Sequence, residues 1–423
     1  MNIPIARLDK FYQMAWWLVV VTMPWAITIN NIALMVLVFA WLSHGNFYEK
    51  WLSFKKSPWI FPFILLFSIY VIGLIYSNNF TSGLNDVLRK IPILALPMIA
   101  TTGPLLSISF INYLKRSFAY SCFTIAIVSL FIAAIRLYTD GATSDNLGVA
   151  ESQYHDLHSS ASLIWLHFSY IQVGRWGDLH PSYLSMFLLF SIVILMNEMV
   201  NNMKHDVLRT TAVVVMILFI GLLASRMAVL AFIASSFYLI IIDIRKRLVR
   251  HTIYFSLTVF ILIASIWYNP VARFRIVEEP ISTSLSISSN TTKWNSVSYR
   301  LLEWKGAWSV IWKNPLFGVG TGDGDQELKT FYSNYNTSTV AIDYNAHNQY
   351  LQTWLETGIV GLVLLLLCLL IPLIKLRNNP SDISFIIIFS SMCLTESILE
   401  RQKGIIFFSL FFAILLCTKK SNQ

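Results

Sequence analysis

The sequence predicts an all-α polytopic membrane protein, and three observations indicate this fold class. The 423-residue chain is 56% hydrophobic and 14% aromatic, and only 13% of its residues are charged. A water-soluble domain of this length cannot bury so large an apolar fraction. Apolar runs of bilayer-spanning length recur from one end of the chain to the other, so we expect about twelve transmembrane helices. One large outer loop would contain helices of its own.

The expected spans follow the apolar runs in chain order. They lie at 11–28, 29–43, 59–76, 91–106, 117–138, 181–200, 210–224, 227–243, 252–268, 350–374, 383–398 and 404–417. The runs at 29–43 and 91–106 are short, so these two segments could be re-entrant or tilted.

The distribution of basic residues gives the expected orientation. With both termini in the cytoplasm, most Lys and Arg residues fall in cytoplasmic segments. The short outer loops would then hold Arg89, Lys90, Arg226, Arg401 and Lys403. This asymmetry follows the positive-inside rule. The net charge of +9 is therefore interpreted as a topogenic signal, and no nucleic-acid partner is expected.

Long polar stretches divide the chain into five parts. We expect N-terminal transmembrane helices over 1–138, an outer loop over 139–180, further transmembrane helices over 181–268, a large periplasmic loop over 269–348 and C-terminal transmembrane helices over 349–423. The cytoplasmic loops are too short to form a domain for ATP-driven chemistry. The expected location is the bacterial inner membrane, with the active face in the periplasm.

The large periplasmic loop contains a predicted helix over 298–312. Bulky residues recur there every four positions: Arg300, Trp304, Trp308 and Trp312. They share one helical face, which would lie against the membrane, and Asn314-Pro315 would end the helix. The glycine-rich stretch 317–325 that follows resembles a nucleotide-binding loop only superficially, because no strand precedes it.

Two arginines of the outer face are candidate binding residues. Arg226 stands between two apolar runs, where a guanidinium must meet water or an anion. The alternative is an interfacial arginine that extends to the membrane surface. Arg300 could hold phosphate oxygens with two parallel N–H donors, while the tryptophan faces suit a sugar ring or an isoprenoid chain. The alternative is an ordinary interfacial helix with one solvated arginine.

Two histidines lie where outer loops re-enter the membrane. His347 could accept a proton from an alcohol or give one to a leaving oxygen. Alternatively, it bonds a backbone carbonyl at the helix mouth. Glu356 lies further along the same run, and a carboxylate there needs a polar partner or an arginine. His180, followed by Pro181 and Tyr183, could bind an acceptor or cap a helix.

Two groups of potential metal ligands have weaker support. One comprises His155, His158 and His167, and the other comprises Asp323, Asp325, Glu327 and Asp343. The histidines lack further ligands nearby, and the acids have irregular spacing. A solvated acidic turn is the favoured interpretation of the second group. We expect neither a metal nor a cofactor.

Several short motifs occur in a fixed order over about 210–365. They are Ser225-Arg226, Arg300-x-x-x-Trp304, Pro315-Leu-Phe-Gly318-Val-Gly320, His347-Asn-x-x-Leu351 and Glu356-x-Gly358-x-x-Gly361. This ordered set resembles the O-antigen ligase and polymerase family of membrane glycosyltransferases. The N-terminal half is similar to the family in topology, and His180-Pro-Ser-Tyr183 also agrees with it.

The resemblance implies a glycosyl transfer from a polyprenyl (undecaprenyl) pyrophosphate carrier. Arg226 and Arg300 would bind the pyrophosphate, and His347 would orient or deprotonate the acceptor hydroxyl for in-line attack. Further substrate contacts would come from Trp304, His180, Tyr183, Asn348 and Glu356. The reaction would be metal-independent and, as a single displacement, inverting. The partners would be the lipid-linked glycan, a lipid or glycan acceptor and membrane lipid.

Three alternatives stay open at this point. A ligase transfers a glycan to an acceptor such as lipid A-core, whereas a polymerase joins repeat units. A single loop that holds both Arg300 and His347 favours the ligase. A transporter or flippase would place ionisable residues near the bilayer midplane, often with inverted repeats, whereas these candidates gather at the outer face. A scaffold protein is the third alternative.

Overall fold

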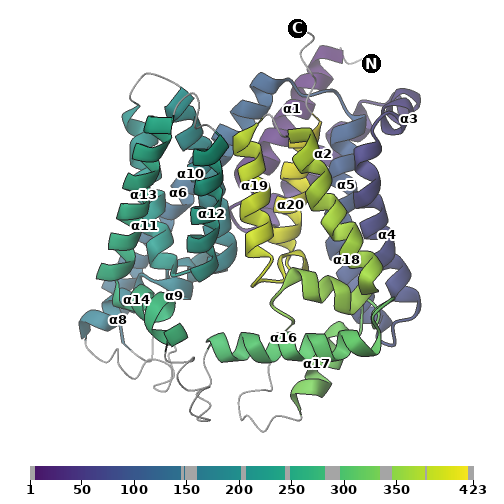
Figure 1. Ribbon diagram of the computed structural model, residues 1–423. Helices are drawn as coiled ribbons and strands as arrows, with labels where there is room; N and C mark the ends of the chain where they lie inside the picture. Colours follow the sequence, from purple (N-terminus) through teal and green to yellow (C-terminus); the bar gives the residue numbers. More distant parts are fainter. Residues whose placement is uncertain are drawn as a thin grey trace. The chain divides into compact units, whose positions relative to one another are not determined.

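The computed structural model (Figure 1) describes residues 5–143, 147, 160–201, 206–242, 248–281, 296–333, 345–376 and 379–417. All regular secondary structure in these ranges is helical, which confirms the predicted all-α class. The chain forms two compact units. Unit 1 comprises 1–23, 27–114 and 299–423, and unit 2 comprises 24–26 and 115–298.

Fewer helices than predicted are long and apolar enough to cross a membrane in the described part of the chain. Within the described ranges, the helices long and apolar enough to cross a membrane are Pro58–Ile75, Ile108–Asp140, Pro181–Val200 and Gln349–Leu376. Two bent pairs bring the total to six if each is one span: Ile27–Ser43 with Phe47–Lys55, and Thr252–Tyr268 with Pro270–Ile281. Other apolar helices have 17 residues or fewer. The count of about twelve is therefore not confirmed, because these helices are shorter than the roughly 20 residues that the hydrocarbon core requires.

Unit 1 combines helices from both ends of the chain. Its elements are α1 (Ile5–Thr22), α2 (Ile27–Ser43), α3 (Phe47–Lys55), η1 (Pro58–Ile60), α4 (Phe61–Ile75), α5 (Phe80–Thr102), most of α16 (Ser296–Lys313), α17 (Gly324–Tyr332), α18 (Gln349–Leu376), α19 (Pro380–Met392), η5 (Ile398–Glu400) and α20 (Gln402–Leu416). Helix α5 packs against α20 and α4, and α4 packs against α18. Figure 1 shows α16 running across one end of this unit, with α17 beside it.

Unit 2 is built around α10. Its elements are α6 (Ile108–Asp140, from Lys115), α8 (Ser160–His167), α9 (Tyr170–Gly174), η3 (Arg175–Gly177), α10 (Pro181–Asn201), α11 (Val207–Leu223), α12 (Arg226–Ile242), α13 (Leu248–Tyr268), α14 (Pro270–Arg273) and η4 (Phe274–Glu278). In the most apolar stretch of α10, 83% of the residues are buried, whereas 44% are buried in the corresponding stretch of α6. The short helices α8, α9 and α14 gather at the end of the unit where α6 and α13 finish (Figure 1).

The predicted positions of two basic residues are wrong. Arg89 and Lys90 lie inside α5, which begins at Phe80, and not in an outer loop before a span at 91–106. The Lys90 side chain is fully buried, and its Nζ lies 2.9 Å from Oε2 of Glu400. This ion pair offsets the cost of burying the ammonium group. A prediction from hydropathy excludes Arg89 and Lys90 from the helix because both are charged. The carboxylate that pairs with Lys90 lies far away in the sequence and cannot be recognised from it.

A second predicted boundary is also wrong. The span expected at 383–398 ends at Met392, and residues 393–400 form a compact segment that includes η5. Gln349, at the start of α18, donates its backbone N–H to the Cys393 carbonyl at 2.8 Å and accepts from the Leu399 N–H at 2.6 Å. The 393–400 segment therefore lies against the first turn of α18.

Helix α18 is broken near its first third. Gly358 has φ 71° and ψ −173°, and this backbone conformation is incompatible with an α-helix. Three backbone hydrogen bonds join this break to the loop after α16: Val319 N–H to Leu355 O (2.9 Å), Gly320 N–H to Glu356 O (3.0 Å) and Ile359 N–H to Pro315 O (3.0 Å). Backbone groups that leave a membrane helix must find partners inside the protein. The glycine-rich loop provides them.

Glycine is required on both sides of this contact. A Cβ on Gly358 would lie 2.0 Å from the Leu316 carbonyl oxygen, and a Cβ on Gly318 would lie 2.5 Å from the Glu356 carbonyl carbon. Both glycines also have φ of +71°, where L side chains are strained. Two motifs far apart in the sequence are thus the two halves of one interlocked structure.

Candidate functional site

Arg300 lies on α16 and bonds to the 393–400 segment. Its Nη2 donates to Oε1 of Glu396 at 3.0 Å, and its Nε donates to the Thr395 carbonyl at 3.3 Å. The arginine side chain is 28% exposed, whereas the Glu396 carboxylate is 9% exposed. A guanidinium has five N–H donors, so these two bonds fix its plane and leave donors for a ligand.

His347 lies just before α18 and pairs with a buried carboxylate on α16. Its Nδ1 is 3.2 Å from Oε2 of Glu303 and 3.3 Å from the Asn345 carbonyl oxygen. Both neighbours are hydrogen-bond acceptors, which places a proton on Nδ1. The Nε2 atom is therefore the ring nitrogen at which His347 could accept or donate a proton. A carboxylate at the opposite nitrogen orients the ring and stabilises its protonated form.

The surroundings of His347 change its acidity and its backbone. Burial lowers the pKa of the imidazole, but the hydrogen bond to Glu303 and the charge of that carboxylate raise the pKa by more, so the net pKa lies above its ordinary value. The φ of His347 is +40°, a left-handed conformation that is uncommon outside glycine. Such a strained backbone persists only where surrounding contacts hold the residue in place, and strained residues are concentrated at functional sites.

A chain of buried amide and carboxyl groups supports the His347 turn. Gln352 accepts from the Ala346 N–H at 2.9 Å and donates to Oε1 of Glu356 at 2.5 Å. Gln352 is fully buried, and Glu356 is 2% exposed. Glu356 thus orients a polar group, which is one of the two roles predicted for it. Its contact with substrate stays a prediction.

Asn348 caps α18. Its Oδ1 accepts from the N–H groups of Tyr350 (3.0 Å) and Leu351 (3.1 Å), and its Nδ2 donates to the Leu394 carbonyl at 3.0 Å. The side chain therefore connects the helix start to the 393–400 segment. The predicted substrate contact of Asn348 is untested by these bonds.

The predicted tryptophan-bearing helix is present as α16. Trp308 makes edge contacts with Trp312 and with Trp354 of α18, at centroid distances of 5.8 and 5.4 Å. Trp312 is 69% exposed, whereas Trp304 is partly buried and its indole N–H has no partner in the described residues. The opposite face of α16 packs on α17 and α18 through Ala307 and its apolar neighbours. This two-faced helix suits a membrane surface.

Arg226 begins α12 in unit 2 and also pairs with a buried carboxylate. Its Nη2 donates to Oε2 of Glu279 at 2.7 Å and to the Ser296 hydroxyl. Glu279 accepts from the Ser296 N–H at 2.8 Å through its other oxygen. The guanidinium is 21% exposed and the glutamate 7%. The arginine is therefore held within a polar cluster at the helix start.

His180 and Tyr183 stand at the start of α10, where Pro181 occupies the first helical position as expected. Their rings make an edge contact at a centroid distance of 5.7 Å, and Tyr183 is 7% exposed. These two residues and Arg226 belong to unit 2, whereas the other predicted site residues belong to unit 1. A common site for both sets stays a prediction.

The potential metal ligands take separate places. His155, His158 and Asp343 lie outside the described residues. Asp323 is 6% exposed and accepts from the backbone N–H groups of Asn78 (2.7 Å) and Asn79 (2.8 Å), so it fixes the start of α5. The interpretation of this position as a solvated acidic turn is wrong. Among the residues that the structure describes, no group of three His, Cys, Asp or Glu side chains could hold a metal.

The sequence predictions missed the acidic partners of the site. Glu303 pairs with His347, Glu396 with Arg300 and Glu279 with Arg226. Two signals were present: Glu303 lies one helical turn beyond Arg300, and Glu396 interrupts an apolar run, where an unpaired carboxylate is costly. Each predicted cation is thus held by a carboxylate.

The fold and these paired cations at helix ends define a polytopic helical membrane protein with polar chemistry at its helix mouths. Residues 211–366 match the family model described as O-antigen ligase, so this segment of the chain is similar to that family. This confirms the resemblance drawn from the motifs. The matched segment contains the motifs from Arg226 to Gly361.

One relative is similar in sequence to the chain over part of its length. An uncharacterized protein of Haemophilus influenzae is 28% identical to the chain over 174 residues, which is 37% of this chain and 41% of the relative. The chain thus spans less than half the length of this relative.

Proposed function

We propose that this protein transfers a glycan from an undecaprenyl pyrophosphate carrier to an acceptor hydroxyl, as an O-antigen ligase does. The acceptor would be lipid A-core or a similar lipid-attached sugar. The reaction would take place at the periplasmic face of the inner membrane, with both termini in the cytoplasm. The observation that carries this proposal is the His347–Glu303 pair at the mouth of α18, at 3.2 Å.

In the proposed reaction, His347 Nε2 takes the proton of the acceptor hydroxyl as its oxygen attacks the anomeric carbon. The bond between that carbon and the pyrophosphate oxygen breaks, and undecaprenyl pyrophosphate leaves. The Glu303 carboxylate stabilises the imidazolium that forms, because it already favours protonated His347. A single displacement of this kind inverts the anomeric centre.

Arg300 would neutralise the charge that develops on the leaving pyrophosphate. Its bonds to Thr395 and Glu396 fix the guanidinium before the donor arrives, which removes reorganisation from the reaction. Arginine would thus supply the positive charge that other transferases take from a divalent cation. Arg226 is proposed as a further donor contact on the motif order alone.

The remaining predicted residues are proposed in supporting roles. Trp304, on the same helix as Arg300, would contact the lipid or sugar part of the donor. Glu356 and Asn348 would position the His347 turn through the bonds described above. His180 and Tyr183 are proposed as acceptor contacts.

Polymerisation of repeat units is the main alternative, because a donor site of this kind serves both reactions. Transport is the other alternative, and two features resemble transporters: the buried Lys90–Glu400 pair and the broken helix α18. In transporters, however, unwound carbonyls bind ions. Here the carbonyls of Leu355 and Glu356 accept from backbone N–H groups, which favours an enzyme.

The deciding experiment reconstitutes wild type and His347→Ala in nanodiscs with an undecaprenyl-pyrophosphate oligosaccharide and candidate acceptors. Release of undecaprenyl pyrophosphate and the length of the product are followed together. One transfer per acceptor that depends on His347 supports a ligase, and a ladder of repeat lengths shows a polymerase. Equal release by the two proteins refutes the role of His347.

A further inference from the structure

Two neighbouring cations of α5 both bond to Glu400, the last residue of the 393–400 segment. Arg89 donates through Nη1 to the Glu400 carbonyl at 2.9 Å, and Lys90 Nζ lies 2.9 Å from Glu400 Oε2. The Lys90 side chain is fully buried, and that of Glu400 is 9% exposed. These residues lie outside the part of the chain that matches the O-antigen ligase family, and the glycosyl transfer proposed above gives them no role.

The start of α18 holds the 393–400 segment at two further points. Gln349 donates its backbone N–H to the Cys393 carbonyl at 2.8 Å, and its Oε1 accepts from the Leu399 N–H at 2.6 Å. The segment is therefore anchored to α18 near both of its ends and to α5 at its last residue. Contacts of this kind leave a connection between two helices little freedom to move.

The middle of the same segment carries the partners of Arg300. The Thr395 carbonyl accepts from Arg300 Nε at 3.3 Å, and Glu396 Oε1 accepts from Nη2 at 3.0 Å. The plane of the guanidinium is therefore only as well fixed as the segment itself. Any group that holds the segment in place also orients Arg300.

A buried chain of contacts links the two anchors. The Lys90 ammonium lies 4.7 Å from the centroid of the Tyr70 ring on α4, and the Tyr70 hydroxyl is 3.2 Å from Thr353 Oγ1. Thr353 Oγ1 also accepts from Gln349 Nε2 at 2.9 Å. The ammonium of Lys90 is thus connected through α4 to the same glutamine that bonds the segment. A change at Lys90 would be felt at both anchors.

Stability alone gives a weak reason for this ion pair. Burying two charges costs about as much free energy as their attraction returns, so an apolar pair of similar volume would stabilise the fold at least as well. Glu400 Oε1 is also buried and has no hydrogen-bond partner in the described part of the chain. What the ion pair adds over an apolar contact is a fixed direction and distance between α5 and residue 400.

From these contacts we propose that Lys90 and Glu400 are positioning residues for Arg300. Their ion pair fixes the end of the 393–400 segment, and the segment in turn fixes the guanidinium through Thr395 and Glu396. Arg300 then meets the leaving pyrophosphate in one orientation, with no reorganisation during the reaction. The catalytic consequence rests on the proposed glycosyl transfer, whereas the anchoring of the segment does not.

The test compares wild type with the double variant Lys90→Met/Glu400→Met, using the full chain in nanodiscs. The double variant removes both charges, so no buried charge is left without a partner and the melting temperature should stay close to that of wild type. Hydrogen exchange of the backbone over 393–400, followed by mass spectrometry, should become about tenfold faster. Exchange at the wild-type rate overturns the proposal.

A second variant keeps the test decisive if the double variant fails to fold. Arg89→Ala removes the hydrogen bond to the Glu400 carbonyl, and the Arg89 side chain is 38% exposed, so its loss opens no cavity in the core. Exchange over 393–400 should again be faster than in wild type. Unchanged exchange in this variant counts against the anchoring by α5.

The matched control is Arg116→Met/Glu198→Met in unit 2. It removes an ion pair with the same 2.9 Å separation, and neither residue contacts the 393–400 segment in the described structure. Exchange over 393–400 and transfer should both match wild type. A change in exchange here would mean that the loss of any ion pair loosens the segment.

Kinetics separate positioning from a merely structural effect. In the Lys90→Met/Glu400→Met variant, kcat should fall by about tenfold or more while the KM for donor changes little, because the orientation of Arg300 matters most as charge develops. In an Arg300→Lys background the same double substitution should have little further effect, since the pair acts through Arg300.

Each result decides part of the proposal. Full transfer despite faster exchange overturns the positioning of Arg300, as does a loss of kcat that simply adds to that of Arg300→Lys. If wild type transfers no glycan, the proposed function fails, and faster exchange in the double variant still supports the anchoring of the segment by Lys90 and Glu400.

Discussion

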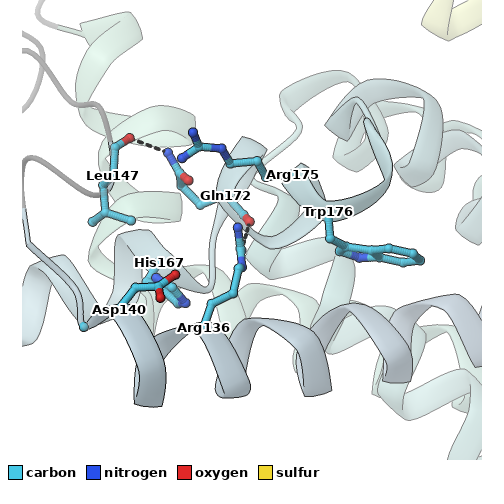
Figure 2. Close-up of a pocket in the computed structure, with 8 residues that line it drawn as sticks. Arg136, Asp140, Leu147, His167, Gln172, Arg175 and Trp176 are labelled. Carbon is cyan, nitrogen blue, oxygen red and sulfur yellow. Dashed lines mark hydrogen bonds between the residues drawn. The ribbon is translucent and has the colours of Figure 1, made fainter.

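The candidate site of unit 1 and a pocket of unit 2 hold their cations in different ways. Arg300 and His347 each meet a carboxylate that is less than one-tenth exposed. The pocket, a cavity of 310 Å³ lined by the last turns of α6 and by α8, α9 and η3, contains Arg136, which donates to the Gln172 carbonyl (Figure 2). A cation that bonds to a buried carboxylate is oriented before substrate arrives. Arg136 is instead oriented by a backbone carbonyl. The comparison shows that, of these three cations in the described part of the chain, only the two in the site of unit 1 pair with buried carboxylates from other segments.

The largest expected effect comes from removing the proton acceptor of unit 1. His347→Ala should lower the rate of undecaprenyl pyrophosphate release by about a thousandfold, the range of a lost general base. The apparent affinity for donor should change little, because Arg300 remains. Single-turnover release in nanodiscs measures both quantities. A loss confined to donor affinity would contradict the comparison, since His347 would then be a binding residue.

A smaller effect is expected at the arginine. Arg300→Lys keeps the charge but loses the fixed planar donors that bond Thr395 and Glu396. The efficiency of transfer should fall by about tenfold to a hundredfold, the cost of a charged hydrogen bond. Steady-state kinetics over a range of donor concentrations measure it. The same substitution at Arg116, outside the site, serves as the control and should leave transfer unchanged.

Substitution of the carboxylate partner should shift the pH dependence. Glu303→Gln removes the charge that raises the pKa of His347, so the pKa should fall. A general base works in its neutral form, so activity rises as pH increases through this pKa. In the variant, the rising limb should move to lower pH, with a maximal rate about tenfold lower. A pH–rate profile that stays in place would show that His347 is not the titrating group.

The same pair has a consequence for stability. Because the pKa of His347 is raised in the folded protein, its ion pair stabilises the fold fully below the unfolded pKa. This contribution is lost as pH rises through the folded pKa. Thermal unfolding of wild type and Glu303→Gln should therefore differ most at mildly acidic pH and converge above neutrality.

Much of the local structure could be predicted from the sequence. A helix covers at least part of every predicted apolar run, α16 covers the predicted helix at 298–312, and α10 begins at Pro181. These features depend on residues close together in the chain, where periodicity and proline geometry act directly. The placement of Arg226 at the start of α12 has the same origin.

The partners of the site residues could not be predicted in this way. Lys90 and Glu400 are separated by 310 positions, and Arg300 and Glu396 by 96. Nothing in the local sequence indicates these pairs. The prediction therefore placed Lys90 in an exposed loop and began the helix at residue 91, whereas α5 begins at Phe80 and buries Lys90. The predicted count of membrane spans is not confirmed, because several apolar helices of the described residues have 17 residues or fewer.

The sequence by itself determined the helical membrane class, the positions of the apolar helices and the order of the family motifs. The tertiary structure alone decided that the loop at 315–320 and the break at Gly358 complete each other's hydrogen bonds. It also decided that Glu303, Glu396 and Glu279 hold the predicted cations. The physical reason is that apolar burial depends on composition along a helix, whereas the partner of a buried charge or of a broken helix is chosen by packing between distant segments.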